Sequence, residues 1–277
     1  MKRITSIGRS LGRSVLPLHG SMSTLNYLRA LKSPPFQVTK TEFLGKPFWF
    51  SNAVGFFHSF EEIFRARVYD FAACTATPQI IDAGANIGMS VIFFKRLYPN
   101  SKIIAFEPDP DIYALLVKNV RSHGYENVDL REAAVWTNDD ELTFYSEGSL
   151  SGSAQVDFRN AGNTKKVKAV RLKTLLTDIS SVDFLKMDIE GAEAEVLFDI
   201  ESELNSVQNL FFEYHSIPDR QQVLGELLSL VKRAGFRYII NGTHGPQSPF
   251  FQRSTGAYDN QMNIFCFRPT PIAFKPV

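Results

Sequence analysis

Short apolar runs alternate with helix-like segments from residue 79 to the end of the chain. The apolar runs predict strands at residues 79–83, 102–106, 128–134, 182–187, 207–212, 236–240 and 263–267. Apolar residues at helical spacing predict helices at residues 89–97, 111–122, 172–178, 191–200 and 218–235. Buried parallel strands form continuous apolar runs, and strands that alternate with helices form a sheet covered on both sides. The pattern therefore predicts an α/β fold with a seven-stranded, mostly parallel sheet and helices on both faces.

A pair of strand-like segments interrupts this alternation. Residues 141–145 and 166–170 alternate polar and apolar positions on either side of a Ser/Gly-rich stretch at 149–153. Such a pattern is typical of a hairpin with a long loop. We predict a hairpin-like insertion at this point of the fold.

The first sixty residues follow another pattern and predict a small N-terminal extension. Short strands are predicted at residues 36–39 and 47–50, with Gly45 in the turn between them. Aromatic residues then recur at near-helical intervals through residues 54–71, which is typical of core packing. We divide the chain into an extension over residues 1–60 and a main domain over residues 61–277.

Composition excludes some classes of function. Thirty Lys and Arg residues against 29 Asp and Glu residues give a net charge of +1, so nucleic acid is not an expected partner. Cys74 and Cys266 lie far apart without zinc-ligand spacing, which indicates a reducing compartment. No apolar run approaches the roughly 18 residues that a membrane span needs. We predict a cytoplasmic protein.

Residues 1–41 contain seven basic residues and no acidic residue. This segment could be a solvated extension, a transit-like leader or a tether to anionic lipid. We favour the solvated extension and leave weak contact with a membrane surface open.

A glycine-containing turn is predicted between the first strand of the sheet and its helix, over the sequence DAGANIG that starts at Asp82. Gly84 and Gly88 let the main chain approach a ligand and turn sharply into the helix. Dinucleotide sites use G-x-G-x-x-G because a pyrophosphate binds the helix N-terminus, whereas here the spacing is G-x-x-x-G. Asp82 would repel a phosphate but suits the ammonium of a methionine group. The turn therefore predicts an S-adenosylmethionine site.

Two further acids follow the next two predicted strands. Glu107 lies at the tip of the second strand, where its carboxylate can accept hydrogen bonds from both ribose hydroxyls. Glu132 follows the third strand and either binds the adenine amino group or is a surface charge.

A second group of polar residues follows the fourth and fifth strands. In a sheet of order 3-2-1-4-5 the first and fourth strands flank the ligand crevice, which places Asp188 opposite the glycine turn. Strand alternation puts Lys186 and Asp188 on one side, so both can face the transfer site or one can neutralise the other. The fifth strand brings Glu213 and His215 to the same rim.

Methyl transfer to an alcohol is an in-line displacement that benefits from a base. We slightly favour His215 as that base, because histidine titrates near neutral pH without help. Alternatively, Asp188 and Glu213 hold a Mg²⁺ that acidifies the bound hydroxyl. Structural roles also remain open: Asp188 or Glu190 can cap the following helix, and His215 can satisfy a loop backbone group.

These segments together resemble the FkbM-type methyltransferase family. The resemblance rests on IIDAGANIGMSVIFF, IIAFEPDP, REAAVW, LKTLL, FLKMDIEGAEAEVL and LFFEYH, in this order, and covers about residues 60 to 240. It implies a Rossmann-like class I methyltransferase domain over residues 61–277, with S-adenosylmethionine as the methyl donor. It also implies O-methylation of a sugar, glycolipid or polyketide-like acceptor. By the same resemblance the cofactor-binding residues are Asp82, Gly84, Asn86, Gly88, Glu107 and, less closely matched, Glu132, and the residues around the acceptor are Asp188, Glu190, Glu213 and His215.

Two alternatives to this function stay open. An NAD(P)-dependent oxidoreductase would use the same kind of sheet, although its glycine pattern is missing. A non-catalytic module that binds S-adenosylmethionine would carry the same motifs. The motifs specify neither the acceptor nor the oligomeric state.

Overall fold

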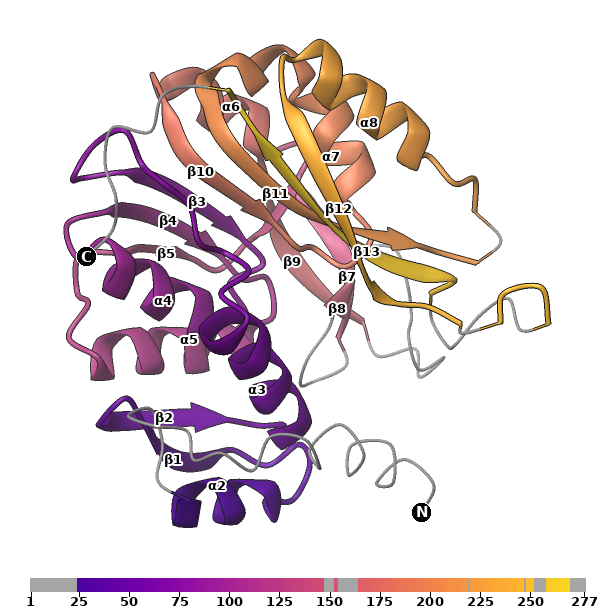
Figure 1. The fold of residues 1–277 in the computed structure, drawn as a ribbon. Coiled ribbons are helices and arrows are strands. Elements are labelled where there is room, and N and C mark those ends of the chain that lie inside the picture. Colours follow the sequence, from indigo (N-terminus) through magenta and orange to yellow (C-terminus); the bar gives the residue numbers. More distant parts are fainter. Residues whose placement is uncertain are drawn as a thin grey trace.

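The computed structural model describes residues 24–146, 152–153, 164–218, 220–246, 248–251 and 258–269 of the chain. A seven-stranded sheet of order β12-β13-β11-β10-β3-β4-β5 forms its centre (Figure 1). Neighbouring strands are parallel except for β13, which is antiparallel to both β11 and β12. The strands are β3 (Gln79–Ala83), β4 (Lys102–Phe106), β5 (Asp129–Arg131), β10 (Val182–Met187), β11 (Val207–Ser216), β12 (Arg237–His244) and β13 (Asn260–Phe267). The predicted α/β, Rossmann-like fold is confirmed.

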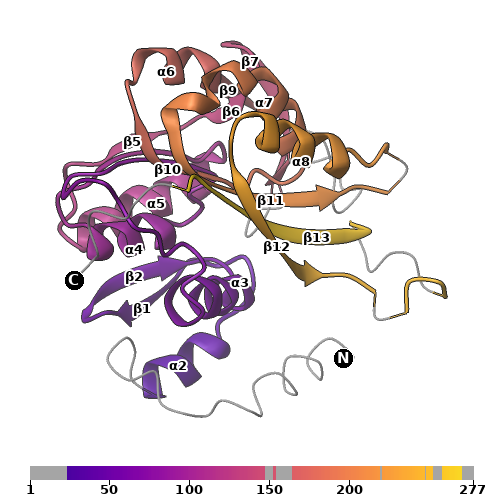
Figure 2. The ribbon, with the colours of Figure 1, turned by 45° about the horizontal axis from the view of Figure 1, so that its top comes forward.

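Two groups of helices cover the two faces of this sheet (Figure 2). Ile80 of β3 belongs to the apolar core that includes Val91, whereas Ile81 belongs to the core that includes Leu197 and Leu227. Successive strand residues point to opposite faces, so the sheet separates the two cores. The first core is covered by α4 (Met89–Leu97) and α5 (Pro110–Ser122), and the second by α6 (Leu172–Asp178), α7 (Glu193–Asp199), the 3-10 helix η2 (Glu201–Ser206) and α8 (Leu224–Arg233).

The N-terminal part packs against the first of these cores. Its elements are α2 (Thr24–Leu31), β1 (Thr39–Phe43), β2 (Lys46–Phe50), α3 (Ala53–Phe60) and the π-helix η1 (Glu61–Arg65). Phe43, Phe48 and Phe56 are buried together with Val91, and the burial of Phe56 agrees with the aromatic pattern predicted for residues 54–71. The predicted boundary at residue 60 falls where α3 passes into η1, and one apolar core continues across it.

Asn119 of α5 links this N-terminal part to the glycine turn. Its Oδ1 accepts the Trp49 N–H at 2.7 Å, and its Nδ2 donates to the carbonyl oxygens of Trp49 at 2.8 Å and Ile87 at 2.9 Å. The side chain is fully buried. Strand β2 is therefore fixed to the same residue that holds the end of the turn.

The predicted insertion forms a second sheet of order β6-β9-β7-β8. Its antiparallel pair, β7 (Glu141–Ser146) and β9 (Thr164–Arg171), confirms the predicted hairpin. The remaining strands are β6 (Ala134–Trp136) and β8 (Gly152–Ser153). The strand predicted at 128–134 is wrong as a single element, because the chain passes from β5 in the main sheet to β6 in the second sheet. Residues 149–151 of the predicted loop lie outside the described residues.

Other predicted boundaries are also wrong. The strands predicted at 207–212, 236–240 and 263–267 lie at 207–216, 237–244 and 260–267. The strand predicted at 36–39 lies at 39–43, and Phe36 before it has a positive φ of 63°. Helix α7 begins at Glu193 instead of residue 191, because Gly191 has a φ of 100° that a right-handed helix cannot contain. Helix α8 begins at Leu224 instead of Pro218, since strand β11 continues to Ser216.

Among the helices in the described part of the chain, none combines the length and apolar character that a membrane crossing requires. The basic residues Lys2, Arg3, Arg9 and Arg13 of the predicted leader lie outside the described part.

Candidate active site

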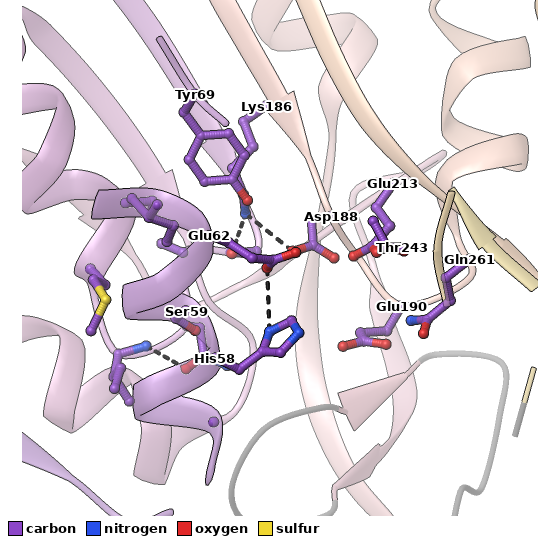
Figure 3. A pocket seen from close by; sticks show the side chains of 18 of the residues that line it. His58, Ser59, Glu62, Tyr69, Lys186, Asp188, Glu190, Glu213, Thr243 and Gln261 are labelled. Atoms are coloured by element: carbon purple, nitrogen blue, oxygen red, sulfur yellow. Dashed lines mark hydrogen bonds and ion pairs between the residues drawn. The ribbon is translucent and has the colours of Figure 1, made fainter. Parts of the chain in front are cut away.

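A cavity of about 340 Å³ lies at the carboxyl ends of β3 and β10 (Figure 3). The glycine turn forms one wall, α3 and η1 form a second, and the ends of β10 and β11 form a third. Its charged or titratable side chains include His58, Glu62, Lys186, Asp188, Glu190 and Glu213. The cavity therefore occupies the crevice between the first and fourth strands of the parallel order, where the sequence predicts the ligand.

The glycine turn has the geometry that its sequence predicts. Gly84 and Gly88 have φ values of 83° and 90°, in the left-handed region. A Cβ atom on Gly84 would overlap with the backbone oxygen of Asp188, and a Cβ atom on Gly88 would lie 2.8 Å from Leu116 Cδ1. Both glycines thus permit contacts that any other residue would break. Asn86 lines the cavity between them with a φ of 48°.

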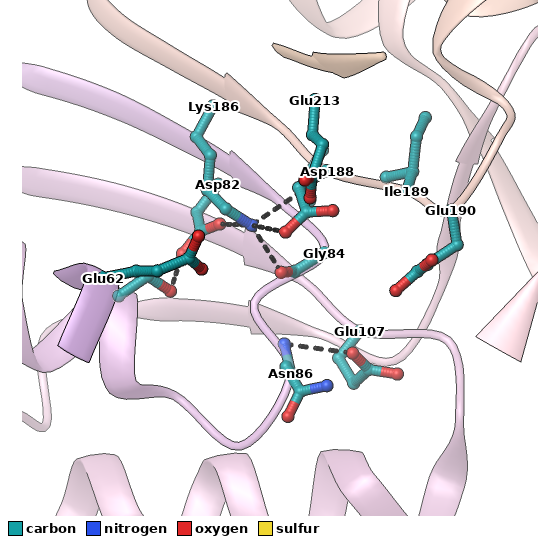
Figure 4. A network of polar contacts seen from close by, with 12 residues as sticks. Glu62, Asp82, Gly84, Asn86, Glu107, Lys186, Asp188, Ile189, Glu190 and Glu213 are labelled. Carbon is teal, nitrogen blue, oxygen red and sulfur yellow. Dashed lines mark hydrogen bonds and ion pairs between the residues drawn. The ribbon is translucent and has the colours of Figure 1, made fainter. Parts of the chain in front are cut away.

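Asp82 and Lys186 form a buried ion pair, of which Lys186 lines the cavity (Figure 4). The Lys186 Nζ lies 3.1 Å from Asp82 Oδ1 and donates to the Gly84 carbonyl oxygen at 2.6 Å, while Ser90 Oγ donates to Asp82 Oδ2 at 2.5 Å. Burial opposes the charge of Lys186, but Asp82 and Asp188 outweigh it and raise the pKa of the amine. Since Asp82 is fully buried with partners inside the protein, the structure does not support its predicted contact with the ligand. Of the two alternatives for Lys186, neutralisation of its neighbours fits.

Glu107 is buried and holds the glycine turn against β4. Its Oε2 accepts the Asn86 N–H at 3.1 Å and its Oε1 accepts the Asp109 N–H at 2.9 Å. Burial is the main reason why the pKa of Glu107 rises to about 8, although the two N–H groups oppose the rise. A ligand that donates further hydrogen bonds to this carboxylate would favour its ionised form.

Glu132 is exposed and does not belong to the cavity lining. The structure therefore does not bring it to the donor, and the alternative interpretation as a surface charge fits this position.

Asp188 and Glu213 face the cavity from the ends of β10 and β11. The side chain of Asp188 is 28% exposed and its Oδ2 lies 3.8 Å from Lys186 Nζ. Glu213 Oε1 accepts a hydrogen bond from Thr243 Oγ1 at 3.1 Å. Burial and the nearby charge of Asp188 raise the pKa of Glu213 to about 9. The predicted placement of both carboxylates at the rim is confirmed.

Neither Asp188 nor Glu190 caps helix α7, which has no side-chain cap. Glu193, the first residue of this helix, instead holds the loop that precedes it. Its carboxylate is buried and accepts the N–H groups of Ile189 at 2.9 Å and Gly191 at 3.0 Å. Glu190 instead accepts a hydrogen bond from the hydroxyl of Tyr258 at 2.8 Å.

His215 lies beneath the carboxylates, and its side chain is 0% exposed. Its Nδ1 is 3.1 Å from Glu193 Oε1, and its Nε2 is 3.5 Å from Glu190 Oε2 and 3.7 Å from Glu213 Oε2. Burial alone would lower the pKa of His215, but Glu193 and Glu190 raise it well above its ordinary value. The structure does not favour His215 as the base, because its side chain is fully buried and does not belong to the cavity lining. Asp188, Glu213 and His215 nevertheless bring ligand atoms within 4.8 Å of one another, as a metal ion requires.

His58 and Glu62 are site residues that the sequence analysis missed. His58 Nδ1 lies 3.3 Å from Glu62 Oε2, and the His58 side chain is 70% exposed. Figure 3 shows this pair on the side of the cavity opposite Asp188 and Glu213. Their spacing of four residues could have identified them, because it places both side chains on one face of a helix. Glu62 also belongs to the π-helix η1, a conformation that is frequent at functional sites.

Comparison with known proteins gives a family match. Residues 82–238 match the family model described as Methyltransferase FkbM domain. The chain is 31% identical to Methyltransferase 1 of Beauveria bassiana (strain ARSEF 2860) over 172 residues, which are 54% of this chain and 68% of that protein. It is 25% identical to 31-O-demethyl-FK506 methyltransferase FkbM of Streptomyces tacrolimicus, over 69% of this chain and 84% of that protein. It is 24% identical to 2-O-methyltransferase NoeI of Sinorhizobium fredii (strain NBRC 101917 / NGR234), over 64% of this chain and 80% of that protein.

Proposed function

This chain belongs to the FkbM family of S-adenosylmethionine-dependent methyltransferases, and we propose that it methylates a hydroxyl oxygen of a small-molecule acceptor. Family membership removes the reason to consider a nicotinamide-dependent oxidoreductase. The name of the relative 2-O-methyltransferase NoeI supports oxygen as the methylated atom. An acidic cavity also suits a neutral acceptor, such as a sugar, glycolipid or polyketide-like alcohol, better than the phosphates of a nucleic acid.

The observation that carries this proposal is the cavity itself. The glycine turn and the acidic ends of β10 and β11 line the same space of about 340 Å³. A donor held at the turn would therefore have its methyl group directed at an acceptor held near Asp188 and Glu213. Holding both reactants in one geometry is a large part of what catalysis of a displacement requires.

The donor side of the cavity is assigned to the turn from Gly84 to Gly88 and to Glu107. Glu107 would accept hydrogen bonds from the ribose hydroxyls in addition to those of the backbone. Asp82 and Lys186 act as positioning residues, because their ion pair fixes the carbonyl oxygen of Gly84. The carboxylates of Glu62 and Asp188 favour the positive sulfonium in the cavity.

The base that we assign to the acceptor hydroxyl is His58. In the reaction the bond between carbon and sulfur breaks, the bond between carbon and the acceptor oxygen forms, and the hydroxyl proton passes to His58 Nε2. Glu62 holds the other ring nitrogen and stabilises the imidazolium that results. This pair replaces His215 in the role that the sequence analysis gave to a histidine.

A divalent cation at Asp188 and Glu213 belongs to the same proposal. Their carboxylate oxygens are hard ligands of the kind that Mg²⁺ uses. A cation there would lower the pKa of a bound acceptor hydroxyl and make its proton easier to remove.

The test of the function is methyl transfer from labelled S-adenosylmethionine to a panel of sugars, glycolipids and polyketide alcohols. With an active acceptor, we expect His58→Ala to lower kcat by about 10²- to 10⁴-fold and to leave donor affinity unchanged, as removal of a general base does. The control Arg65→Ala breaks the exposed pair with Glu61 on the same π-helix and leaves kcat unchanged. Full turnover in His58→Ala would exclude it as the base. Donor binding without transfer to any acceptor would instead favour a non-catalytic module.

A further inference from the structure

We propose that Asp188, Glu213 and His215 form a binding site for a divalent transition-metal ion, with His215 Nε2 as its third ligand. One ligand atom from each of these residues lies within 4.8 Å of the others. Asp188 follows β10, while Glu213 and His215 are two residues apart on β11, so both β11 side chains lie on one side of the sheet. The parallel register of Met187 with Phe212 brings Asp188 next to Glu213.

The unpaired nitrogen of His215 is an independent indication of a ligand. Nε2 is buried and has no hydrogen-bond partner among the described residues. Nε2 lies 3.5 Å from Glu190 Oε2 and 3.7 Å from Glu213 Oε2, which is too long for good hydrogen bonds. The nitrogen nevertheless faces these carboxylates. A buried polar atom without a partner is costly unless something absent from the protein itself binds it.

Glu193 orients His215 in the way that metal sites require. Its Oε1 lies 3.1 Å from His215 Nδ1, so the ring can donate Nδ1–H and present the lone pair of Nε2 to the carboxylates. Glu193 is itself fixed by the N–H groups of Ile189 and Gly191. A carboxylate behind a metal-binding histidine is a recurring arrangement that fixes the tautomer and the ring orientation. A cation would take the place of any proton on Nε2.

The set of ligands indicates which ions fit. Mg²⁺ and Ca²⁺ prefer oxygen ligands, whereas an imidazole nitrogen suits transition metals. Mn²⁺ is a transition-metal ion that also accepts carboxylate oxygens, so it fits two carboxylates and one imidazole. Carboxylates also outnumber amines at the site. The amine of Lys186 lies 3.1 Å from Asp82 and 3.8 Å from Asp188, so it is shared between them. We therefore assign the site to an ion such as Mn²⁺, in preference to the Mg²⁺ that the sequence suggested.

Two of the three ligands, Asp188 and Glu213, also line the cavity. Three protein ligands leave coordination positions for other oxygens, and an acceptor hydroxyl is the group that the cavity would supply. The ion would thus hold the acceptor oxygen in the cavity that His58 also lines. This role of the ion rests on the proposed methyl transfer, whereas binding of the ion does not.

Binding of Mn²⁺ to the chelator-treated full-length chain tests the site without donor or acceptor. We expect calorimetry to give one Mn²⁺ per chain and pulsed EPR to detect a directly bound nitrogen. Asp188→Asn keeps the side-chain shape and should weaken Mn²⁺ binding tenfold or more, while His215→Ala should remove the nitrogen signal. Glu132→Gln, which changes an exposed acid outside the cavity, is the control and should bind Mn²⁺ as the unchanged protein does.

Equal Mn²⁺ affinity in Asp188→Asn, or a bound ion with no nitrogen signal in the unchanged protein, would overturn the proposal. Circular dichroism checks the fold of each variant. Asp188 is partly exposed and Asn has the same shape, so we expect Asp188→Asn to fold. If His215→Ala does not fold, the Mn²⁺ affinity of Asp188→Asn and the nitrogen signal of the unchanged protein still test the site. Failure of the methyltransferase proposal would appear in the labelled transfer assay and would leave the Mn²⁺ titration unaffected.

Discussion

Asp82 and Glu107 are carboxylates at or near the ends of neighbouring strands, yet their partners differ. Asp82 lies directly opposite Lys186 in the pairing of β3 with β10, and this contact takes up its charge. Glu107 accepts only backbone N–H groups and has no cationic partner within ion-pair distance among the described residues. The sequence places both acids near strand ends. Whether each acid pairs with a lysine or faces a ligand depends on the register between neighbouring strands, which cannot be derived from one sequence.

The carboxylate of Glu107 predicts that donor binding depends on pH. Affinity for S-adenosylmethionine should rise from about pH 6 to about pH 8 and level off above, because only the ionised carboxylate can accept from both ribose hydroxyls. Burial raises the pKa of Glu107 to about 8 in the donor-free protein, so below that pH binding must release a proton. The change is up to about tenfold per pH unit. Calorimetry over this pH range measures it.

Glu107→Gln is the matched control for this prediction. It removes the titrating group, so any pH dependence that remains belongs to the donor's own amino group or to other residues. Parallel profiles for the two proteins would show that Glu107 does not bind the ribose.

At the level of secondary-structure elements, the predictions succeed where a turn or a cap marks the end of the element. The elements with matching bounds are β3, α4, β4, α6 and β10. Helix α5 is capped at Asp109, and Pro110 follows in its first turn. The strand at 128–134 fails because tertiary pairing divides one apolar run between two sheets, and periodicity contains no information on pairing.

His58 and Glu62, which line the cavity, illustrate the same limit. Aromatic residues dominate the helical pattern around them, so packing explains the segment without reference to a ligand. Only the folded chain places α3 and η1 beside the glycine turn. No spacing in the sequence connects residue 58 with residue 188.

The side chain of Asn119 links β2, α5 and the glycine turn, and its loss should destabilise the fold. Asn119→Ala should lower the free energy of unfolding by about 2–4 kcal/mol, since it removes three hydrogen bonds and leaves backbone groups of Trp49 and Ile87 without these partners. Denaturation with guanidinium measures the change. Asn127→Ala, at an exposed position, should alter stability by no more than about 0.5 kcal/mol. Equal effects of the two substitutions would show that the link contributes little.

On the scale of the whole molecule, the N-terminal part and the main domain share one apolar core. Phe43 and Phe64 have ring centroids 5.0 Å apart, and Phe64 contacts Phe93 of α4 at 5.4 Å. Aromatic contacts therefore run without interruption from β1 to the helix after the glycine turn. The sequence pattern suggested a separate extension, and contacts between distant parts of the chain leave no local signal in that pattern.

The two tryptophans report on this continuity, since Trp49 lies in β2 and Trp136 lies in β6. In the single-tryptophan variants Trp136→Phe and Trp49→Phe, fluorescence should change at the same denaturant concentration as the far-UV circular dichroism of the same variant. The reason is that the N-terminal part and the main domain contribute to one apolar core, so we expect them to unfold together. A Trp49 signal that changes first would establish residues before 61 as an independent unit.

The cavity wall that contains His58 and Glu62 lies before residue 82, where the match to the family model begins. The wall formed by the glycine turn lies within the match. An acceptor near Asp188 and Glu213 would therefore meet one wall from inside the matched domain and one from outside it, so a change in α3 and η1 alone alters its surroundings and leaves the glycine turn as it is.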